Sequence, residues 1–226
     1  MAHPSPHDPT AERWSDVDAY LTGTLVAPDE ALSASIASLA DEGMPEIEVA
    51  PLTGKLLHLL ARIAGARRVL EVGTLGAYST IWLARALPEG GRVVTIEAEP
   101  HNAEVARRNL ARAGVADRVE VREGRGADVL PTLAGDEPFD LVFIDADKES
   151  NALYLDWAAR LGRPGTVVVV DNVVRSGHVV ETDAGAQVDG VRAGLAVLRD
   201  DPRFEATALQ TLDRKGWDGV AIALLV

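Results

Sequence analysis

RVLEVGTLGAYSTIWLARAL (residues 68–87) is the stretch that decides the fold. A short apolar run ends in a turn that carries two glycines, and apolar residues then recur at helical spacing. In an open α/β sheet the first strand normally ends in such a turn, at the edge of the sheet where ligands bind. The sequence therefore predicts a ligand site at the turn around Gly73.

Short apolar runs alternate with helical stretches after this point. Strands are expected at 67–72, 92–98, 118–124, 139–147 and 165–172, with helices at 79–87, 104–113, 127–133 and 152–161. This alternation indicates parallel strands covered by helices on both faces. Two further strands, 204–212 and 219–226, are joined by a turn-rich segment of about seven residues, too short for a parallel crossover. The prediction is a seven-stranded mixed α/β sheet with an antiparallel last strand.

Residues 15–226 are expected to form one domain, because 226 residues with 47% hydrophobic content suffice for one sizeable core. Residues 1–14, rich in Pro and His, are expected as a flexible tail. Residues 15–65 have apolar positions three or four apart and form a helical N-terminal segment in this prediction.

The composition excludes several classes of function. A net charge of −13 without a Lys/Arg cluster disfavours nucleic acid as a partner. The absence of cysteine excludes disulfides and thiolate metal ligands, so a metal would need oxygen or imidazole donors. No apolar run approaches the roughly 18 residues of a membrane span, and the N-terminus lacks the order of a signal peptide. A cytoplasmic protein is the expectation.

The glycine turn does not fit a phosphate ligand. A dinucleotide fingerprint would need glycine at Leu75 and Tyr78, and a phosphate loop also fails at Tyr78. Glu97, about 20 residues past the turn, is placed to accept hydrogen bonds from ribose hydroxyls. Glu71 ends a buried strand and needs a donor or a cation, such as an α-amino group. Ribose plus amino acid points toward S-adenosylmethionine, although spacing alone leaves NAD or FAD open.

Two later strands end in oxygen donors. Asp145 follows one buried strand, and Asp171 and Asn172 end the next, so the fold should gather them at one sheet edge. Such donors suit Mg²⁺ or a similar hard cation, whereas the alternative is that each aspartate caps a helix. Lys148, three residues past Asp145, is placed to act as a general base, and an ordinary surface lysine is the alternative.

With these residues in place, the chain resembles the cation-dependent O-methyltransferases, which include catechol O-methyltransferase, caffeoyl-CoA O-methyltransferase and many small bacterial proteins. The shared motifs are LEVGTLGAYST, IEAEP, FIDADKESN, VVVVDNVVRSG and RKGWDGVAIALL, which span roughly residues 47–226. The resemblance implies a Rossmann-like class I methyltransferase fold, S-adenosylmethionine as methyl donor, a divalent cation and a homodimer. The implied reaction is methyl transfer to one of two vicinal phenolic hydroxyls of a small catechol-like acceptor.

The resemblance also implies roles for individual positions. Glu97 would hold the ribose and Gly126 would lie beside the adenine. Residues expected to line the methionine end of the donor are Val49, Glu71, Gly73, Thr74 and Ser79. Asp145, Asp171 and Asn172 match the metal ligands, with Asp145 also bordering the cofactor, and Lys148 matches the catalytic lysine.

The chain departs from the family pattern in two places. Gly76–Ala77 precedes Tyr78 where relatives usually have Thr-Gly, so Ala77 is exposed to strain if its φ is positive. Val174 replaces an aromatic residue of the plant relatives, which bears on the class of acceptor. Residues 175–187, with His178, are expected as a loop on the substrate side.

Alternatives to the implied methyl transfer are a metal-independent methyltransferase, an NAD-linked reductase and a non-catalytic cofactor-binding dimer.

Overall fold

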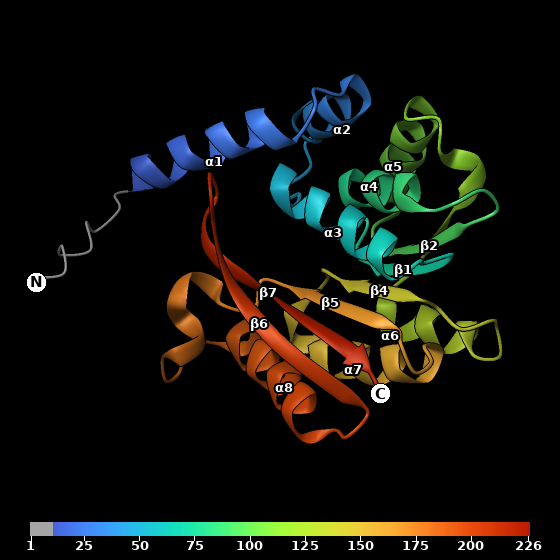
Figure 1. The fold of residues 1–226 in the computed structure, drawn as a ribbon, viewed down its shortest axis with the longest axis vertical. Helices are drawn as coiled ribbons and strands as arrows, with labels where there is room; N and C mark the ends of the chain where they lie inside the picture. The colour runs from blue at the N-terminus through green and yellow to red at the C-terminus, as the bar shows by residue number, and fades with distance from the viewer. Residues whose placement is uncertain (1–10) are drawn as a thin grey trace, which may run out of the picture.

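A seven-stranded sheet forms the middle layer of the molecule (Figure 1). The structure is a computed structural model that describes residues 11–226. The strands are β1 (Arg68–Val72), β2 (Arg92–Glu97), β3 (Val119–Glu123), β4 (Leu141–Ile144), β5 (Val167–Asp171), β6 (Phe204–Asp213) and β7 (Gly216–Leu225). Their order in the sheet is β3-β2-β1-β4-β5-β7-β6. Strands β1 to β5 are parallel, and β7 pairs antiparallel with both β5 and β6. The predicted mixed sheet with its antiparallel last strand is confirmed.

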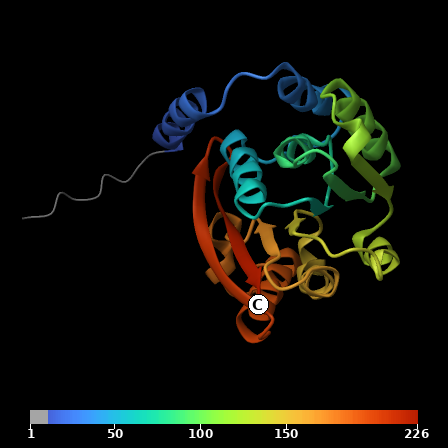
Figure 2. The same cartoon turned by 45° about the vertical axis from the view of Figure 1, so that its right-hand side comes forward.

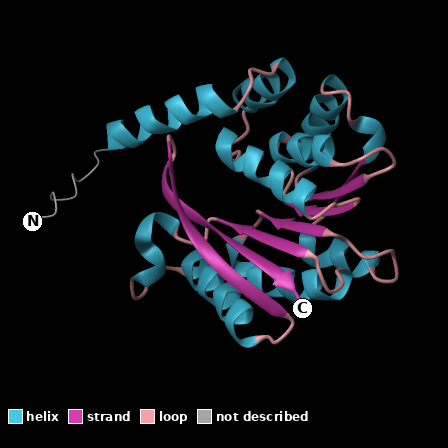
Figure 3. Cartoon of the chain, in the orientation of Figure 1, coloured by secondary structure: helices cyan, strands magenta, loops and turns pink. Residues whose placement is uncertain are grey.

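Helices cover both faces of this sheet (Figure 3). They are α1 (Ala11–Leu25), α2 (Glu30–Asp41), α3 (Pro51–Ile63), α4 (Tyr78–Ala86), α5 (Pro100–Arg112), α6 (Gly126–Val129), α7 (Asn151–Leu161) and α8 (Ala186–Asp200). Short 3₁₀ turns are η1 (Ala116–Arg118), η2 (Leu130–Leu133), η3 (Lys148–Ser150) and η4 (Arg175–Val180). Helices α3, α4 and α5 lie on one face, and α6, α7 and α8 lie on the other.

Alternation along β1 divides the core into two parts. Val69 packs with α3 and α4, whereas Leu70 and Val72 pack with α7 on the opposite face. Glu71 points to the same face as Val69 and is completely buried. The strand order reverses between β1 and β4, so the carboxyl ends of these strands form the edge at which α/β proteins bind ligands.

The C-terminal strands differ from the prediction in their connection. They form a hairpin whose last pair is Asp213 with Gly216, so the turn consists of Arg214 and Lys215 and not of seven residues. Gly216, with φ of +120°, lets the chain reverse this tightly. The hairpin reaches as far as α1, where the Arg214 amide donates a hydrogen bond to Asp18 (Figure 2).

Two helices differ from the prediction. Helix α1 begins at Ala11, inside the expected tail of residues 1–14, because residues 11–13 are good helix formers. The rest of the expected tail, residues 1–10, lies outside the described part of the chain. Helix α8 has no counterpart in the prediction, although Val188, Val191 and Leu198 mark its buried face.

Among residues 11–226, no helix combines the length and apolarity needed to cross a membrane.

Candidate active site

A cavity of about 970 Å³ opens at the carboxyl ends of the parallel strands. The turns after β1, β2, β3, β4 and β5 all contribute to its wall, and residues 45–49 and the tip of the β6–β7 hairpin complete it. The predicted site residues that line it are Val49, Gly73, Thr74, Ser79, Glu97, Gly126, Asp145, Lys148 and Asn172. Glu71 and Asp171 lie behind the wall, so the structure brings the predicted residues together in two layers.

The turn after β1 passes very close to the turn after β4. Gly73 has φ of +100°, and a Cβ added there would lie 2.1 Å from the carbonyl oxygen of Asp145. Only glycine therefore fits this position. Ala77 has φ of +65°, so the backbone strain considered for this departure from the family pattern is present. A non-glycine residue in this conformation costs roughly 1–2 kcal/mol of stability.

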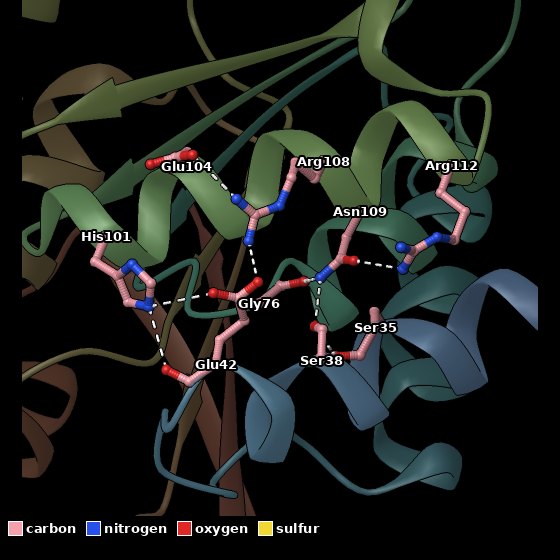
Figure 4. Close-up of polar contacts among 9 residues, drawn as sticks. All are labelled: Ser35, Ser38, Glu42, Gly76, His101, Glu104, Arg108, Asn109 and Arg112. Atoms are coloured by element: carbon pink, nitrogen blue, oxygen red, sulfur yellow. Dashed lines mark hydrogen bonds and ion pairs between the residues drawn. The ribbon is translucent and has the colours of Figure 1, made fainter.

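Side chains from α5 hold the glycine turn from outside (Figure 4). Asn109, which is buried, donates hydrogen bonds from Nδ2 to the Gly76 carbonyl at 3.0 Å and to the Ser38 hydroxyl of α2 at 2.8 Å. Arg108 pairs with Glu42, just past the end of α2. Because residues 45–49 follow directly, these contacts fix both the turn and one rim of the cavity.

Glu71 does not contact the cavity, contrary to the expectation that it lines the donor site. Its carboxylate accepts hydrogen bonds from Ser79 Oγ at 2.6 Å, Thr80 Oγ1 at 2.5 Å and Thr95 Oγ1 at 2.6 Å. These hydroxyls supply the donors that a buried carboxylate needs. Burial nevertheless raises the pKa of Glu71 to about 7, with the three hydrogen bonds opposing the shift. Glu71 therefore positions Ser79, which does line the cavity.

Glu97 lies at the end of β2 and closes the other side of the turn. Its Oε2 accepts hydrogen bonds from the amides of Thr74 at 3.2 Å and Leu75 at 2.7 Å, and its Oε1 accepts from the amide of Glu99 at 3.0 Å. The carboxylate is thereby fixed beside the cavity, where an acidic group can receive the hydroxyls of a ribose.

The turn after β3 forms a narrow slot with Tyr154 of α7. A Cβ on Gly126 would lie 2.7 Å from the Tyr154 ring, so glycine is needed for this close approach. The Tyr154 hydroxyl donates a hydrogen bond to Asp147, and burial together with this contact raises the pKa of Tyr154. Sequence reasoning missed Tyr154 and Asp147, because their pairing depends on how α7 returns to the sheet.

The polar residues after β4 and β5 lie next to one another. Lys148 Nζ donates a hydrogen bond to Asp145 Oδ1 at 2.7 Å, and only 9% of the lysine side chain is exposed. Burial and the charge of Asp145 raise the pKa of Asp171 to about 7. Lys148 lowers the pKa of Asp171 but does not cancel these two effects, so a cation beside Asp171 would stabilise its charged form.

These donors fit a hard divalent cation. Asp145 and Asp171 supply carboxylate oxygens, and Asn172, which lines the cavity, supplies an amide oxygen. Within residues 11–226 no cluster of three or more His, Cys, Asp or Glu side chains is arranged to hold a metal, so the remaining ligands of a cation here would be water or substrate.

Other residues of the wall have no individual role in the prediction, although residues 175–187 are expected as a loop on the substrate side. Arg175 and Gln187, from the two ends of the loop after β5, line the cavity, as do Glu48 and Lys215, which pair at 3.2 Å. His178 is exposed, pairs with Glu181 at 2.8 Å and does not line this cavity.

Comparison with known proteins gives a consistent result. Residues 27–222 match the family described as O-methyltransferase. The chain is 56% identical over 210 residues to catechol O-methyltransferase of Mycobacterium tuberculosis, covering 93% of this chain and 95% of that protein. It is 46% identical over 215 residues to catechol O-methyltransferase of Niastella koreensis, with coverage of 94% and 97%.

Solved structures are equally similar. The O-methyltransferase from Bacillus cereus in complex with SAH has a TM-score of 0.94 and 47% identity, covering 96% of this chain and 100% of that one. TomG from Streptomyces achromogenes, involved in tomaymycin synthesis and solved in complex with SAM, has a TM-score of 0.93 and 50% identity, with coverage of 96% and 99%.

Proposed function

The chain belongs to the O-methyltransferase family, and from this premise we propose that it transfers the methyl group of S-adenosylmethionine to a hydroxyl of a catechol-like acceptor with the help of a divalent cation. The observation that carries the proposal is that one cavity joins Glu97, beside the glycine turn, to Asp145 and its buried partner Lys148. The solved relatives in complex with SAH and with SAM support the choice of donor.

The donor would lie along the turns after β1, β2 and β3. Ser79 and Thr74 would face its methionine part, Glu97 would accept hydrogen bonds from its ribose, and Gly126 would leave room for its adenine beside Tyr154. Positioning the donor and the acceptor in one enclosed cavity supplies much of the rate enhancement for a displacement of this kind.

Asp145, Asp171 and Asn172 would hold the cation. When bound, the cation would polarise the acceptor hydroxyls and screen the charge of Asp145 from Lys148. Lys148 would then accept the proton of the reacting hydroxyl at Nζ. Nζ of Lys148 lies 2.7 Å from Asp145 Oδ1, so this contact fixes the position of the proposed base.

The names of the two similar catechol O-methyltransferases support vicinal hydroxyls on the acceptor. Oxygen donors after β4 and β5 suit chelation of such an acceptor, because a hard cation keeps positions for substrate oxygens.

Methylation of catechol by S-adenosylmethionine, followed with Mg²⁺ and with excess EDTA, tests the proposal. We expect turnover that the chelator abolishes, and we expect Asp145→Asn and Asp171→Asn to abolish cation-dependent turnover. Asp136→Asn, in an exposed loop, is the matched control. Full activity of both site variants in excess chelator would replace this proposal with a metal-independent methyltransferase.

We also propose a homodimer. Exposed apolar side chains on α1 and α3, namely Val17, Tyr20, Leu25 and Ile63, support an apolar contact surface there. Sedimentation equilibrium should give twice the chain mass of 24.0 kDa, and a monomer at micromolar concentration would refute the proposal.

A further inference from the structure

Arg175 lies between two hollows on the acceptor side of the molecule. It lines the main cavity and also a neighbouring hollow of about 370 Å³. Its Nη2 donates a hydrogen bond to Gln187 Oε1 at 2.7 Å, and Gln187 lines both hollows as well. The guanidinium and the amide therefore lie at the boundary where the far end of an acceptor would arrive.

Among the described residues, the charge of the half-buried Arg175 has no carboxylate partner, a property it shares in the cavity wall only with the exposed Arg125 and not with Lys148 or Lys215. Lys148 pairs with Asp145 at 2.7 Å, and Lys215 pairs with Glu48 at 3.2 Å. Within the described chain, residues 11–226, no carboxylate lies within 4.0 Å of the Arg175 guanidinium. Arg175 is therefore a half-buried cation without a carboxylate partner in this part of the chain, although the chain as a whole has a net charge of −13.

The backbone holds Arg175 in a fixed and uncommon conformation. Asp218 Oδ1 accepts hydrogen bonds from the amides of Val174 at 3.0 Å and Arg175 at 2.9 Å. Arg175 has φ of +55°, which a non-glycine residue adopts rarely. Gly177, two residues further along the loop, leaves no space for a Cβ, which would lie 2.7 Å from the Trp217 ring. The loop therefore presents the side chain from a defined position.

We propose that Arg175 and Gln187 bind a carboxylate carried by the acceptor, on the side of its ring away from the reacting hydroxyls. This inference rests on the function proposed above and narrows it to acidic catechols. A planar guanidinium can donate two parallel hydrogen bonds to a carboxylate, and the Gln187 amide can add a third donor. Glu46, an exposed carboxylate on the rim of the main cavity, would instead favour an acceptor that carries an ammonium group.

Three acceptors separate these possibilities: 3,4-dihydroxybenzoate, uncharged catechol and dopamine. The quantity to compare is the ratio of kcat/KM for each charged acceptor to kcat/KM for catechol. We expect the wild-type protein to favour dihydroxybenzoate at least tenfold. Arg175→Gln should lower that ratio at least tenfold, and Arg175→Lys, which keeps the charge but not the planar fork, should lower it less.

The matched control is Arg199→Gln, which removes an exposed arginine at the distant end of α8 and should leave the ratio unchanged. Titration of dihydroxybenzoate into the protein loaded with S-adenosylhomocysteine provides a readout without turnover. Binding there should weaken at least tenfold in Arg175→Gln.

The outcomes are distinguishable. If the wild-type protein methylates none of the three acceptors, the proposed function fails and this inference fails with it. If catechol is methylated but the ratio for dihydroxybenzoate is the same in wild type and Arg175→Gln, this inference is overturned and the function stands. A preference for dopamine that Glu46→Gln removes also overturns it.

Discussion

Replacing Glu71 by Gln should change how the stability of the protein depends on pH. The ordinary pKa of this carboxyl is 4.5, and burial raises it to about 7 in the folded chain. Between these values the folded chain holds a proton at Glu71 that the unfolded chain has released. The contribution of this bound proton to the free energy of unfolding is therefore fully present below about pH 4.5 and is lost as the pH rises through about 7.

The size of the effect follows from this shift. At 1.36 kcal/mol per pKa unit, the shift corresponds to about 3 kcal/mol of unfolding free energy lost between pH 4.5 and pH 8. The glutamine side chain in Glu71→Gln would reproduce the protonated acid, because its amide offers both a donor and an acceptor to the hydroxyls of Ser79, Thr80 and Thr95. Urea unfolding at a series of pH values should thus show that Glu71→Gln loses about 3 kcal/mol less than wild type over this range.

The comparison between the two proteins separates Glu71 from groups that do not interact with it, because those groups contribute equally to both; Asp145, whose charge adds to the pKa shift of Glu71, is the exception. Glu205→Gln, on the exposed face of the edge strand β6, is the matched control and should run parallel to wild type. Parallel curves for wild type and Glu71→Gln would refute the reasoning, since the carboxyl would then titrate alike in the folded and unfolded chains.

Three further predictions concern the donor side of the cavity. Glu97→Ala should raise the Kd for S-adenosylmethionine at least tenfold with a smaller effect on kcat, as measured by titration calorimetry and steady-state kinetics; an unchanged Kd would contradict the ribose assignment. Gly73→Ala should lower the unfolding free energy by about 3 kcal/mol and abolish donor binding, because its Cβ would lie 2.1 Å from the Asp145 carbonyl; urea unfolding and the same calorimetry measure both effects. Asn109→Ala should cost about 2 kcal/mol in urea unfolding, since it leaves the buried Gly76 carbonyl without its side-chain donor; a loss below about 0.5 kcal/mol would show that this tether is dispensable.

Strands β1, β2, β4 and β5 could be predicted because they are buried on both faces, whereas the parallel edge strand β3 is only partly buried. Strands buried on both faces appear in the sequence as short apolar runs, for example the run that ends at Ile144. The edge strand β6 is different, since most of its residues between Glu205 and Asp213 are exposed and the end near the turn is polar. The sequence predicts this strand at 204–212 but not its pairing with β7 up to Gly216, which extends the hairpin to the contact of Arg214 with Asp18 of α1.

Most of the predicted site residues lie at the carboxyl end of a parallel strand or in the turn after it; Val49, before α3, and Ser79, in α4, are exceptions. Asp145 and Gly73 reach the cavity because the parallel sheet brings all strand ends to one edge. Arg175 and Lys215 reach it only through the loop after β5 and the tip of a hairpin. The sequence predicts residues 175–187 as a loop on the substrate side, but tertiary packing decides which of its side chains reach the cavity and brings Lys215 there.

Two buried carboxylates on this sheet show why the metal and donor assignments differ. Burial raises the pKa of both Glu71 and Asp171 to about 7. Glu71 meets three hydroxyl donors and is closed off from the cavity, so a proton suffices to make it neutral. Among residues 11–226, the Asp171 carboxylate accepts a hydrogen bond only from the Asn172 amide, and it faces the charges of Asp145 and Lys148. In the proposed function, this difference in fixed donors is the reason why Asp171 would receive a cation whereas a proton suffices for Glu71.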